Sequence, residues 1–275
     1  MQLRLPSGTL DLSRPVVMGV LNVTPDSFSD GGRFATLDAA VLEARQMAAE
    51  GAAIIDVGGE STRPGAAEVS EDEEISRVVP VIEAMSGLGV AISIDTSKPR
   101  VMQAAVSAGA SIVNDVYALR RDGALAMAAS LEVAVCLMHM QGEPRTMQEN
   151  PRYDDVAGEV SAFLSERVAA CMAAGVPRER IVVDPGFGFG KTALHNVELL
   201  ANLDRLGTLR LPLLVGLSRK STLGALTGRP VEGRLAAGVA AAVLAVERGA
   251  HIVRTHDVAA TLDALKVTAA VMRLG

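Results

Sequence analysis

Polar side chains that could share one catalytic site stand at the ends of short apolar runs in this chain. Asp95 and Asp184 each end such a run, Asn114 stands one residue before the end of another, and Lys220 lies just after a fourth. Carboxylates that are desolvated together need hydrogen-bond donors, either from a basic neighbour or from a ligand. We expect Lys220, in the segment LSRKS, to be the protein partner. The alternative is an Asp–Lys network that only stabilises the fold.

A second group of residues suits the binding of an anion. Arg254 and His256 are two residues apart at the end of the last apolar run, so in a strand both side chains point the same way. Asn22 ends the first run, which is adjacent to the last one in a closed barrel. Together they predict a donor cluster for an anion, or for a metal-bound diphosphate with Asn22 as an oxygen ligand. Asp56, inside the second run, is expected to be structural, and His139 is expected to line the mouth of the site.

The glycine-rich segment DPGFGFGKT at 184–192 resembles two phosphate-binding loops and matches neither. The pattern GxxxxGK[ST] needs glycine where Pro185 stands, and GxGxxG starting at Gly186 needs glycine at Lys191. We expect the glycines to let the backbone pass close to a ligand, with Phe189 as an apolar wall.

Eight apolar runs, each followed by a helical stretch, predict the scaffold for these residues. Buried runs that alternate with helices are typical of parallel βαβ units. Eight such units predict an α/β fold, a closed (βα)8 TIM barrel whose active site lies on the loops that follow the strands. The runs are VVMGVLN ending at Asn22, AAIIDVGGES ending at Ser61, AISID ending at Asp95, SIVND ending at Asp115, VAVCLMH ending at His139, IVVD ending at Asp184, LPLLVGLS ending at Ser218 and HIVRTH ending at His256.

The intervening segments complete this prediction. An N-terminal β-hairpin over Leu3–Leu12, with its turn at 6–9, is expected to plug the barrel floor. The segment 95–99 predicts a helix start, with a capping residue just before Pro99 in the first turn. No linker divides the chain, so we expect a single TIM-barrel domain over 1–275. Helices are predicted over 37–50, 71–86, 98–108, 122–130, 154–174, 193–206, 233–248 and 257–273.

Three of the connections that follow predicted strands are long, at 23–36, 60–70 and 140–153. Long loops in a compact domain are usually functional, and in a barrel these three lie on the catalytic face. The alternative, a surface insertion, is hard to maintain for three loops on one face.

Composition excludes several classes of protein. A net charge of -6 argues against nucleic-acid binding but leaves anionic small molecules possible. Cys136 and Cys171 belong to no CxxC motif, so we expect two reduced core thiols and a cytoplasmic protein. We expect no signal peptide and no membrane span, because the longest uncharged apolar candidate, 235–246, has 12 residues.

The ordered motifs of this chain resemble those of the dihydropteroate synthase family. The resemblance runs from the first predicted strand to the last helix and departs at Thr255, where the family usually has Val, and at Gly233, where an acidic residue is common. The matching segments are MGVLNVTPDSFSDGG at 18–32, DVGGESTRPGA at 56–66, ISIDT at 92–96, IVNDV at 112–116, HMQGEPRTMQENPRYDD at 139–155, DPGFGFGKT at 184–192, GLSRKS at 216–221 and RTHDV at 254–258.

This resemblance implies a transferase of folate biosynthesis and a sulfonamide target. Such an enzyme condenses (7,8-dihydropterin-6-yl)methyl diphosphate with 4-aminobenzoate to give 7,8-dihydropteroate and diphosphate, with Mg²⁺. Loss of diphosphate would come first, followed by attack of the arylamine, with no protein nucleophile. The resemblance also implies a homodimer whose partners are small molecules.

The resemblance also implies a role for each candidate residue. Asp95, Lys220 and Arg63 would be catalytic, with Asp95 stabilising developing positive charge. The pterin would be held by Asp95, Asn114, Met138, Asp184, Lys220 and Arg254. The diphosphate would be held by Asn22, Thr62, Arg63, Arg254 and His256, with Asn22 as the metal ligand. The aminobenzoate would be held by Phe28, Arg63, Pro64, Phe189 and Ser218.

Two other functions stay open at this point. A corrinoid-linked methyltetrahydrofolate methyltransferase shares the barrel and a pterin pocket, but it needs neither the 18–32 and 60–66 loops nor an Arg/His anion site. A non-catalytic pterin-binding barrel would be expected to lose Asn22, Arg63, Asp95 or Lys220, and all four are present.

Overall fold

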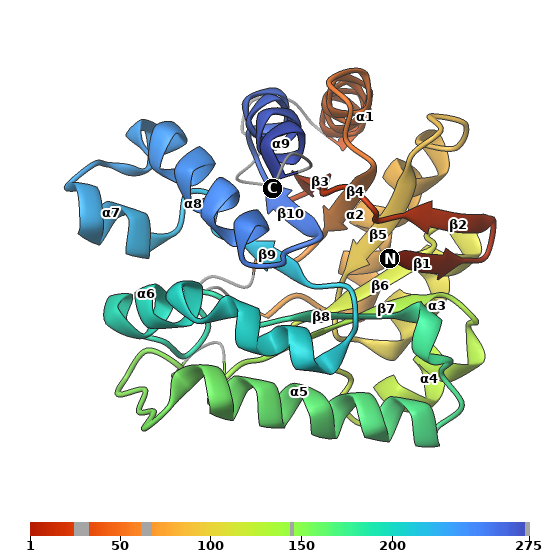
Figure 1. Cartoon of the computed structure of the whole chain (residues 1–275). Coiled ribbons are helices and arrows are strands. Elements are labelled where there is room, and N and C mark those ends of the chain that lie inside the picture. The colour runs from red at the N-terminus through yellow and green to blue at the C-terminus, as the bar shows by residue number, and fades with distance from the viewer. Residues whose placement is uncertain (25–32, 62–67, 144–145, 273–275) are drawn as a thin grey trace.

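Eight parallel strands form one sheet at the centre of the molecule (Figure 1). The computed structural model describes residues 1–24, 33–61, 68–143 and 146–272. The spatial order of the strands is β8-β7-β6-β5-β4-β3-β10-β9. They are β3 (Val16–Asn22), β4 (Ile54–Gly58), β5 (Ala91–Asp95), β6 (Ile112–Asp115), β7 (Ala134–Met138), β8 (Ile181–Asp184), β9 (Leu214–Gly216) and β10 (Ile252–Thr255).

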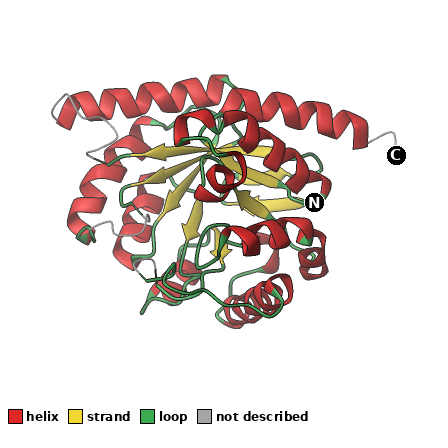
Figure 2. Ribbon diagram, turned by 90° about the vertical axis from the view of Figure 1, so that its left-hand side faces the viewer, coloured by secondary structure: helices red, strands yellow, loops and turns green. Residues whose placement is uncertain are grey.

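A parallel bridge closes the sheet into a barrel. Val183 of β8 pairs with Leu213, directly before β9, and its backbone N–H donates to the carbonyl of Pro212 at 3.0 Å. Helices surround the strands on the outside, as Figure 2 shows. The predicted (βα)8 barrel is therefore confirmed. The second, fifth, seventh and eighth apolar runs continue one to three residues past the strands, so Ser61, His139, Ser218 and His256 lie just beyond strand ends.

The predicted helices are all present, with shifted boundaries. The prediction missed α7, a short helix directly after Lys220, and the stretch after α6 is a 3₁₀ helix, η3 (Leu203–Leu209). Local capping explains two of the starts: Ser70 accepts from the N–H of Glu73, and Thr192 forms a reciprocal capping box with His195. The helices are α1 (Arg33–Ala49), α2 (Glu71–Ala84), α3 (Pro99–Ala108), α4 (Ala124–Ser130), α5 (Val156–Ala173), α6 (Ala193–Ala201), α7 (Ser221–Thr227), α8 (Leu235–Glu247) and α9 (Val258–Met272).

One predicted helix start is only half right. Helix α3 does begin at Pro99, but Lys98 at the capping position makes no side-chain cap. Its ammonium instead lies 2.7 Å from carboxylate oxygens of both Glu60 and Glu74. A lysine has no acceptor atom, so it cannot satisfy the free N–H groups of a helix start, and the chain uses it for a buried ion-pair group instead.

The barrel interior below the strand ends is a closed apolar core. Strands β1 (Gln2–Leu5) and β2 (Gly8–Asp11) form the predicted antiparallel hairpin, and Leu3, Leu5 and Leu12 pack against the inward side chains of the strands. The hairpin therefore plugs the barrel floor, as predicted. The inward residues it contacts include Met18, Ile54, Ile112, Ala134, Cys136, Val182, Leu214 and Ile252.

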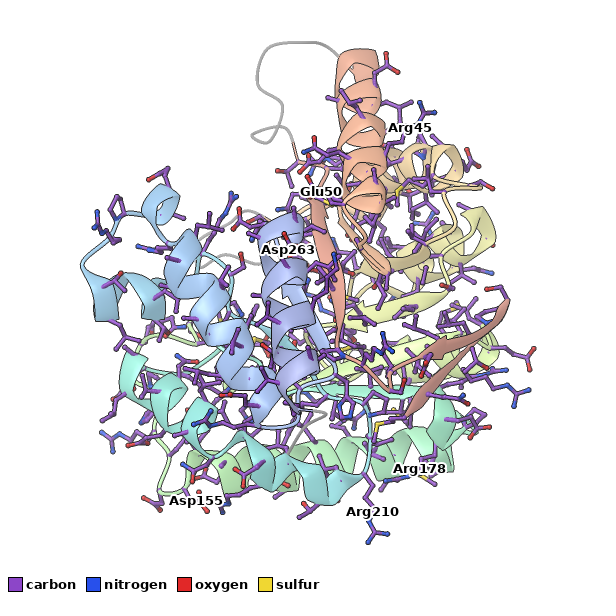
Figure 3. All side chains as sticks on the ribbon, turned by 45° about the horizontal axis from the view of Figure 1, so that its top comes forward. Arg45, Glu50, Asp155, Arg178, Arg210 and Asp263 are labelled. Carbon is purple, nitrogen blue, oxygen red and sulfur yellow. The ribbon has the colours of Figure 1, made fainter. Side chains whose placement is uncertain are left out.

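Three further features can be compared with the expectations from composition: the cysteines, the absence of a membrane span and the exposed charges. Cys136 and Cys171 are buried free thiols. In the part of the chain that the structure describes, no helix is long and apolar enough to span a membrane. Charged side chains such as Arg45, Arg210 and Asp263 are exposed on the outer elements (Figure 3).

Candidate active site at the carboxyl ends of the strands

Strand alternation places a set of polar side chains inside the barrel, one layer above the apolar core. Ile54 and Ile112 belong to that core, and the next inward positions on the same two strands are Asp56 and Asn114. Asp95 is paired in register with Asn114, so it faces the same side. Asp184 and Arg254 follow Val182 and Ile252 in the same way. The structure therefore brings these five side chains to the barrel mouth.

Arg254 connects two of the carboxylates. Its Nε donates to Asp56 Oδ2 at 2.7 Å and its Nη2 donates to Asp95 Oδ2 at 2.8 Å. The same Asp56 oxygen accepts from Asn114 Nδ2 at 3.0 Å. We predicted Lys220 as the partner of the strand-end carboxylates, and this was wrong for Asp95. The reason is reach, because Arg254 points into the barrel from β10 and its forked donors extend across the interior to β4 and β5.

Asp56 has a larger part in the site than the sequence indicated. It is fully buried, and its Oδ1 accepts no hydrogen bond from the described residues. Its Oδ2 orients the guanidinium of Arg254 and the amide of Asn114 together. Because the amide nitrogen of Asn114 is used in this way, its Oδ1 is the atom left to accept from a ligand.

The carboxyl group of Asp95 titrates close to neutral pH. Burial raises the pKa of its carboxyl to about 7, and the charges of Asp56 and Glu74 act in the same direction, while Arg254 opposes them. Burial also raises the pKa of Asp184, with Lys220 as the strongest opposing charge. The N–H of Gly186 donates to Asp184 Oδ1 at 2.7 Å. Both carboxylates would therefore gain from additional donors in a ligand.

Lys220 lies over the glycine-rich segment. Its ammonium donates to the carbonyl of Phe187 and lies 4.8 Å from the centre of the Phe189 ring. Burial lowers the pKa of this lysine to about 8, and the charge of Asp184 opposes the shift. The absent side chain of Gly188 leaves room, since a Cβ there would stand 3.2 Å from Lys220 Cδ.

The predicted anion cluster is not held together by direct contacts. Arg254 is turned toward Asp56 and Asp95, whereas Nδ1 of His256 lies 3.1 Å from Ser218 Oγ. The sequence indicates that both residues stand at the end of the last strand, but not where their side chains turn. The carboxylates of Asp56 and Asp95, on β4 and β5 across the barrel, decide the direction of Arg254, and Ser218 contacts His256.

Apolar side chains line one wall of the mouth. Met138 is paired in register with Asp184 and is buried beside Val116, Met140 and Met147. Tyr117 and the half-buried Phe189 pack against this group. The wall offers a flat, polarisable surface beside the carboxylates, which suits an aromatic ring.

Four predicted site residues, Phe28, Thr62, Arg63 and Pro64, lie outside the described residues. The structure also shows two lysines that sequence reasoning did not assign. Lys98 forms ion pairs with Glu60, which follows β4, and with Glu74 of α2. Lys191 is buried within the glycine-rich segment. In the sequence, Lys191 stands out only as the residue that breaks the GxGxxG pattern. Nearby apolar residues such as Phe189 are the sequence feature that indicates its burial.

Comparison with known proteins agrees with this geometry. The model of the pterin binding enzyme family matches residues 18–256. Dihydropteroate synthase of Escherichia coli (strain K12) is 53% identical over 273 residues, which is 99% of this chain and 97% of the relative. The chain belongs to the dihydropteroate synthase family. It is therefore a transferase of folate biosynthesis, and the function that its motifs resemble is confirmed at this level.

Solved structures of the family superpose on nearly the whole chain. A Yersinia pestis dihydropteroate synthase in a sulfonamide drug complex is 49% identical with a TM-score of 0.95, covering 100% of both chains. A Xanthomonas albilineans dihydropteroate synthase with 4-aminobenzoic acid is 53% identical with a TM-score of 0.93, covering 99% of both. The barrel and its mouth are thus those of the family.

Proposed function

We propose that this chain condenses (7,8-dihydropterin-6-yl)methyl diphosphate with 4-aminobenzoate to give 7,8-dihydropteroate and diphosphate. The observation that carries the proposal is the excess of buried acceptors at the barrel mouth. Asp56, Asp95 and Asp184 lie there, and among the described residues Arg254, Lys220 and the buried Lys191 are the cations that act on them. A neutral ring with several N–H donors satisfies such a site better than an anion does.

The pterin ring edge fits the individual atoms. Its amino-pyrimidinone edge presents paired N–H donors, which the carboxylate of Asp184 would accept. Asn114 would accept with Oδ1, since its nitrogen is hydrogen-bonded to Asp56. Lys220 would donate to the ring carbonyl in place of its bond to Phe187. Met138 and Arg254 would cover the two faces of the ring.

The reaction then needs stabilisation of charge and positioning of two substrates. The bond between carbon and the bridging oxygen breaks, and its electron pair leaves with diphosphate. The resulting cation is delocalised into the pterin, and ionised Asp95 would stabilise it electrostatically. The arylamine nitrogen attacks the carbon and afterwards releases a proton. Catalysis would consist of orientation and preorganised charge.

Asn22, at the end of β3, and Asp95, at the end of β5, fit a requirement for Mg²⁺. Asn22 Oδ1 and Asp95 Oδ2 lie 3.6 and 4.0 Å from the point where a Cβ on Gly58 would stand, so two hard oxygen donors face one space. Among the described residues no group of three or more His, Cys, Asp or Glu could hold a metal alone. Mg²⁺ commonly takes one or two protein oxygens and completes its shell with substrate phosphates and water. Bound there through Asn22, it would neutralise charge on the departing diphosphate.

The second substrate would lie between the glycine-rich segment and β9. Phe189 would contact the 4-aminobenzoate ring, and Ser218, two residues after the end of β9, would contact its polar end. Phe28, Arg63 and Pro64 are assigned to this subsite from the sequence motifs, and Thr62 with Arg63 to the diphosphate. His256 would bind the diphosphate, and the contact between its Nδ1 and Ser218 Oγ would orient the imidazole ring.

A turnover assay tests the proposal directly. Purified protein should release diphosphate only when both the pterin diphosphate and 4-aminobenzoate are present with Mg²⁺, and 7,8-dihydropteroate should form in equal amount. Lys220→Met serves as a folded, inactive control. Binding of the pterin without any turnover would identify a non-catalytic barrel, and methyl transfer from methyltetrahydrofolate would identify the methyltransferase alternative. Either result would contradict the proposal.

We also propose a cytoplasmic homodimer that associates through the last helices. Support comes from large apolar side chains exposed on α7, α8 and α9, namely Leu226, Leu235, Leu244, Val267, Val271 and Met272. The two buried free thiols agree with a reducing compartment. Sedimentation analysis should give twice the chain mass, and Val267→Glu should shift the protein toward monomer.

A further inference from the structure

The ammonium of Lys191 is buried and fully hydrogen-bonded. Lys191 is 2% exposed, and its Nζ has three partners in reach. They are Nδ1 of His139 at 2.9 Å, the carbonyl of Gly186 at 2.9 Å and the carbonyl of Phe189 at 3.1 Å. No ligand is needed to satisfy this lysine, so its place is within the wall of the site.

The three partners join two connections of the barrel. Gly186 and Phe189 belong to the segment after β8, and His139 directly follows β7. The two backbones touch so closely that a Cβ on Gly186 or Gly190 would overlap a carbonyl oxygen of His139 or Gln141. Both glycines also have positive φ, at +66° and +61°. The glycine-rich segment is therefore shaped to lie directly on residues 139–141.

The same segment carries the atoms that contact Lys220. The Phe187 carbonyl accepts from its Nζ, and the Phe189 ring lies 4.8 Å from that nitrogen. We propose that Lys191 and His139 form a buried lysine–imidazole pair that positions this segment, and through it Lys220, for the reaction. The inference rests on the proposed function, because it assigns the pair to the lysine that would contact the pterin.

The pair keeps its contacts in either protonation state. An ammonium donates all three N–H groups, so Nδ1 of His139 accepts and the ring proton lies on Nε2. A neutral amine donates to the two carbonyls and accepts from a proton on Nδ1. Burial lowers the pKa of Lys191 to about 7, and burial and the charge of Lys191 lower the pKa of His139 to about 3. The imidazole thus stays neutral while its tautomer follows the charge of Lys191.

Surrounding groups favour this arrangement. The Phe163 ring of α5 lies edge-on to the imidazole at 4.9 Å between centres, and Tyr153 lies at 6.1 Å. The hydroxyl of Tyr153 donates to the carbonyl of Gly190 at 2.9 Å. Arg120, from the connection after β6, is a further positive charge that opposes an imidazolium. At Lys191 the charge of Lys220 favours the neutral amine and the charge of Asp184 opposes it.

Nitrogen NMR of histidine-labelled full-length protein tests the pair without any turnover. The His139 ring should remain neutral from pH 5 to 9 and change from the Nε2–H to the Nδ1–H tautomer near pH 7. In Lys191→Met the tautomer change of His139 should disappear, and the pKa of the His139 imidazole should rise toward its ordinary value. An imidazolium that forms near pH 6.5 in the unaltered protein, or a spectrum insensitive to Lys191→Met, would overturn the inference.

Steady-state kinetics test the positioning role with a matched pair of variants. His139→Leu removes the acceptor, whereas His139→Gln keeps an oxygen that can accept from Lys191. We expect about a tenfold rise in the KM of pterin diphosphate for His139→Leu and Lys191→Met, from loss of a charged hydrogen bond, and less than about threefold for His139→Gln. Arg210→Met, at an exposed position directly after η3, should change nothing.

Equal KM values for the Leu and Gln variants would contradict a positioning role. Failure of the proposed function looks different, since it would abolish turnover in the unaltered protein and leave the NMR result intact.

Discussion

The two ends of the barrel are built by the same strands and are held together in opposite ways. At the floor, the inward side chains are apolar, close-packed and covered by the hairpin. One layer higher on those strands, the inward side chains include Asp56, Asp95, Asn114, Asp184 and Arg254. The floor is satisfied by packing alone, whereas at the mouth one buried carboxylate oxygen of Asp56 has no partner among the described residues.

This difference shows where stability and function separate along a strand. Burying an isoleucine stabilises the fold by about 1.5–3 kcal/mol through removal of apolar surface from water. Burying a carboxylate opposes folding unless donors replace its water. The raised pKa values of Asp95 and Asp184 are the direct sign of that penalty. The mouth therefore holds charge that a ligand can complete, and the floor supplies the stability that makes this possible.

The strongest test of the comparison is a cavity at the floor. Ile112→Ala should lower the free energy of unfolding by about 2–5 kcal/mol, because the closed core cannot collapse around the lost side chain. Denaturant titration measures this change. At 25 °C the KM values of both substrates should stay within about twofold. A large KM change with little loss of stability would show that floor and mouth are not separable.

The opposite result is expected for Asp95→Asn. Removing the charge that stabilises the cation should lower kcat by about 10²–10³-fold. Stability should rise at pH 8, because the folded-state pKa of about 7 lies above the unfolded value. The stabilisation from a protonated Asp95 is complete below about pH 3.9 and is lost as the pH rises through 7. Thermal unfolding at pH 8 should therefore occur at a higher temperature than in the unaltered protein, and the gain should vanish at pH 4.

Asp184→Asn should act on binding rather than on the fold. The amide replaces one acceptor by a donor facing the pterin N–H groups, so the affinity for pterin diphosphate should fall at least about tenfold. Calorimetric titration gives the affinity, and an unchanged circular dichroism spectrum shows that the fold is intact. Asp204→Asn, at an exposed position of η3, is the control. Near-native affinity would refute the assignment of Asp184 to the pterin edge.

The smallest expected effect is a change in the pH dependence of kcat/KM. Asp95 gains its charge as the pH rises through about 7, and Lys220 loses its charge as the pH rises through about 8. We expect a bell-shaped profile with its maximum between these values. Lys220→Arg keeps a charge at higher pH, so the alkaline limb should move upward while the acid limb stays. An unmoved alkaline limb would assign it to another group.

Much of the architecture could be predicted from the sequence because burial leaves a periodic pattern. The eight apolar runs and the hairpin follow from local rules, and the structure contains each of them. The missed helix α7 has 7 residues and directly follows Lys220. Its first residue, Ser221, belongs to the segment LSRKS, which we assigned to the site and not to a helix. Short elements carry too few residues for a periodic pattern to show.

The sequence predicts which residues lie in the candidate site, but not which of them contact one another. The sequence by itself determined that Asp95, Asn114, Asp184 and Arg254 end up inside one barrel mouth, since strand parity and strand order fix this. Only the tertiary structure decided that Arg254 turns to Asp56 and Asp95, that Lys220 donates to Phe187 and that Lys191 is buried against His139. These contacts join residues from strands and loops far apart in the chain, and long side chains choose among them by distance, desolvation and charge, none of which is written in local sequence.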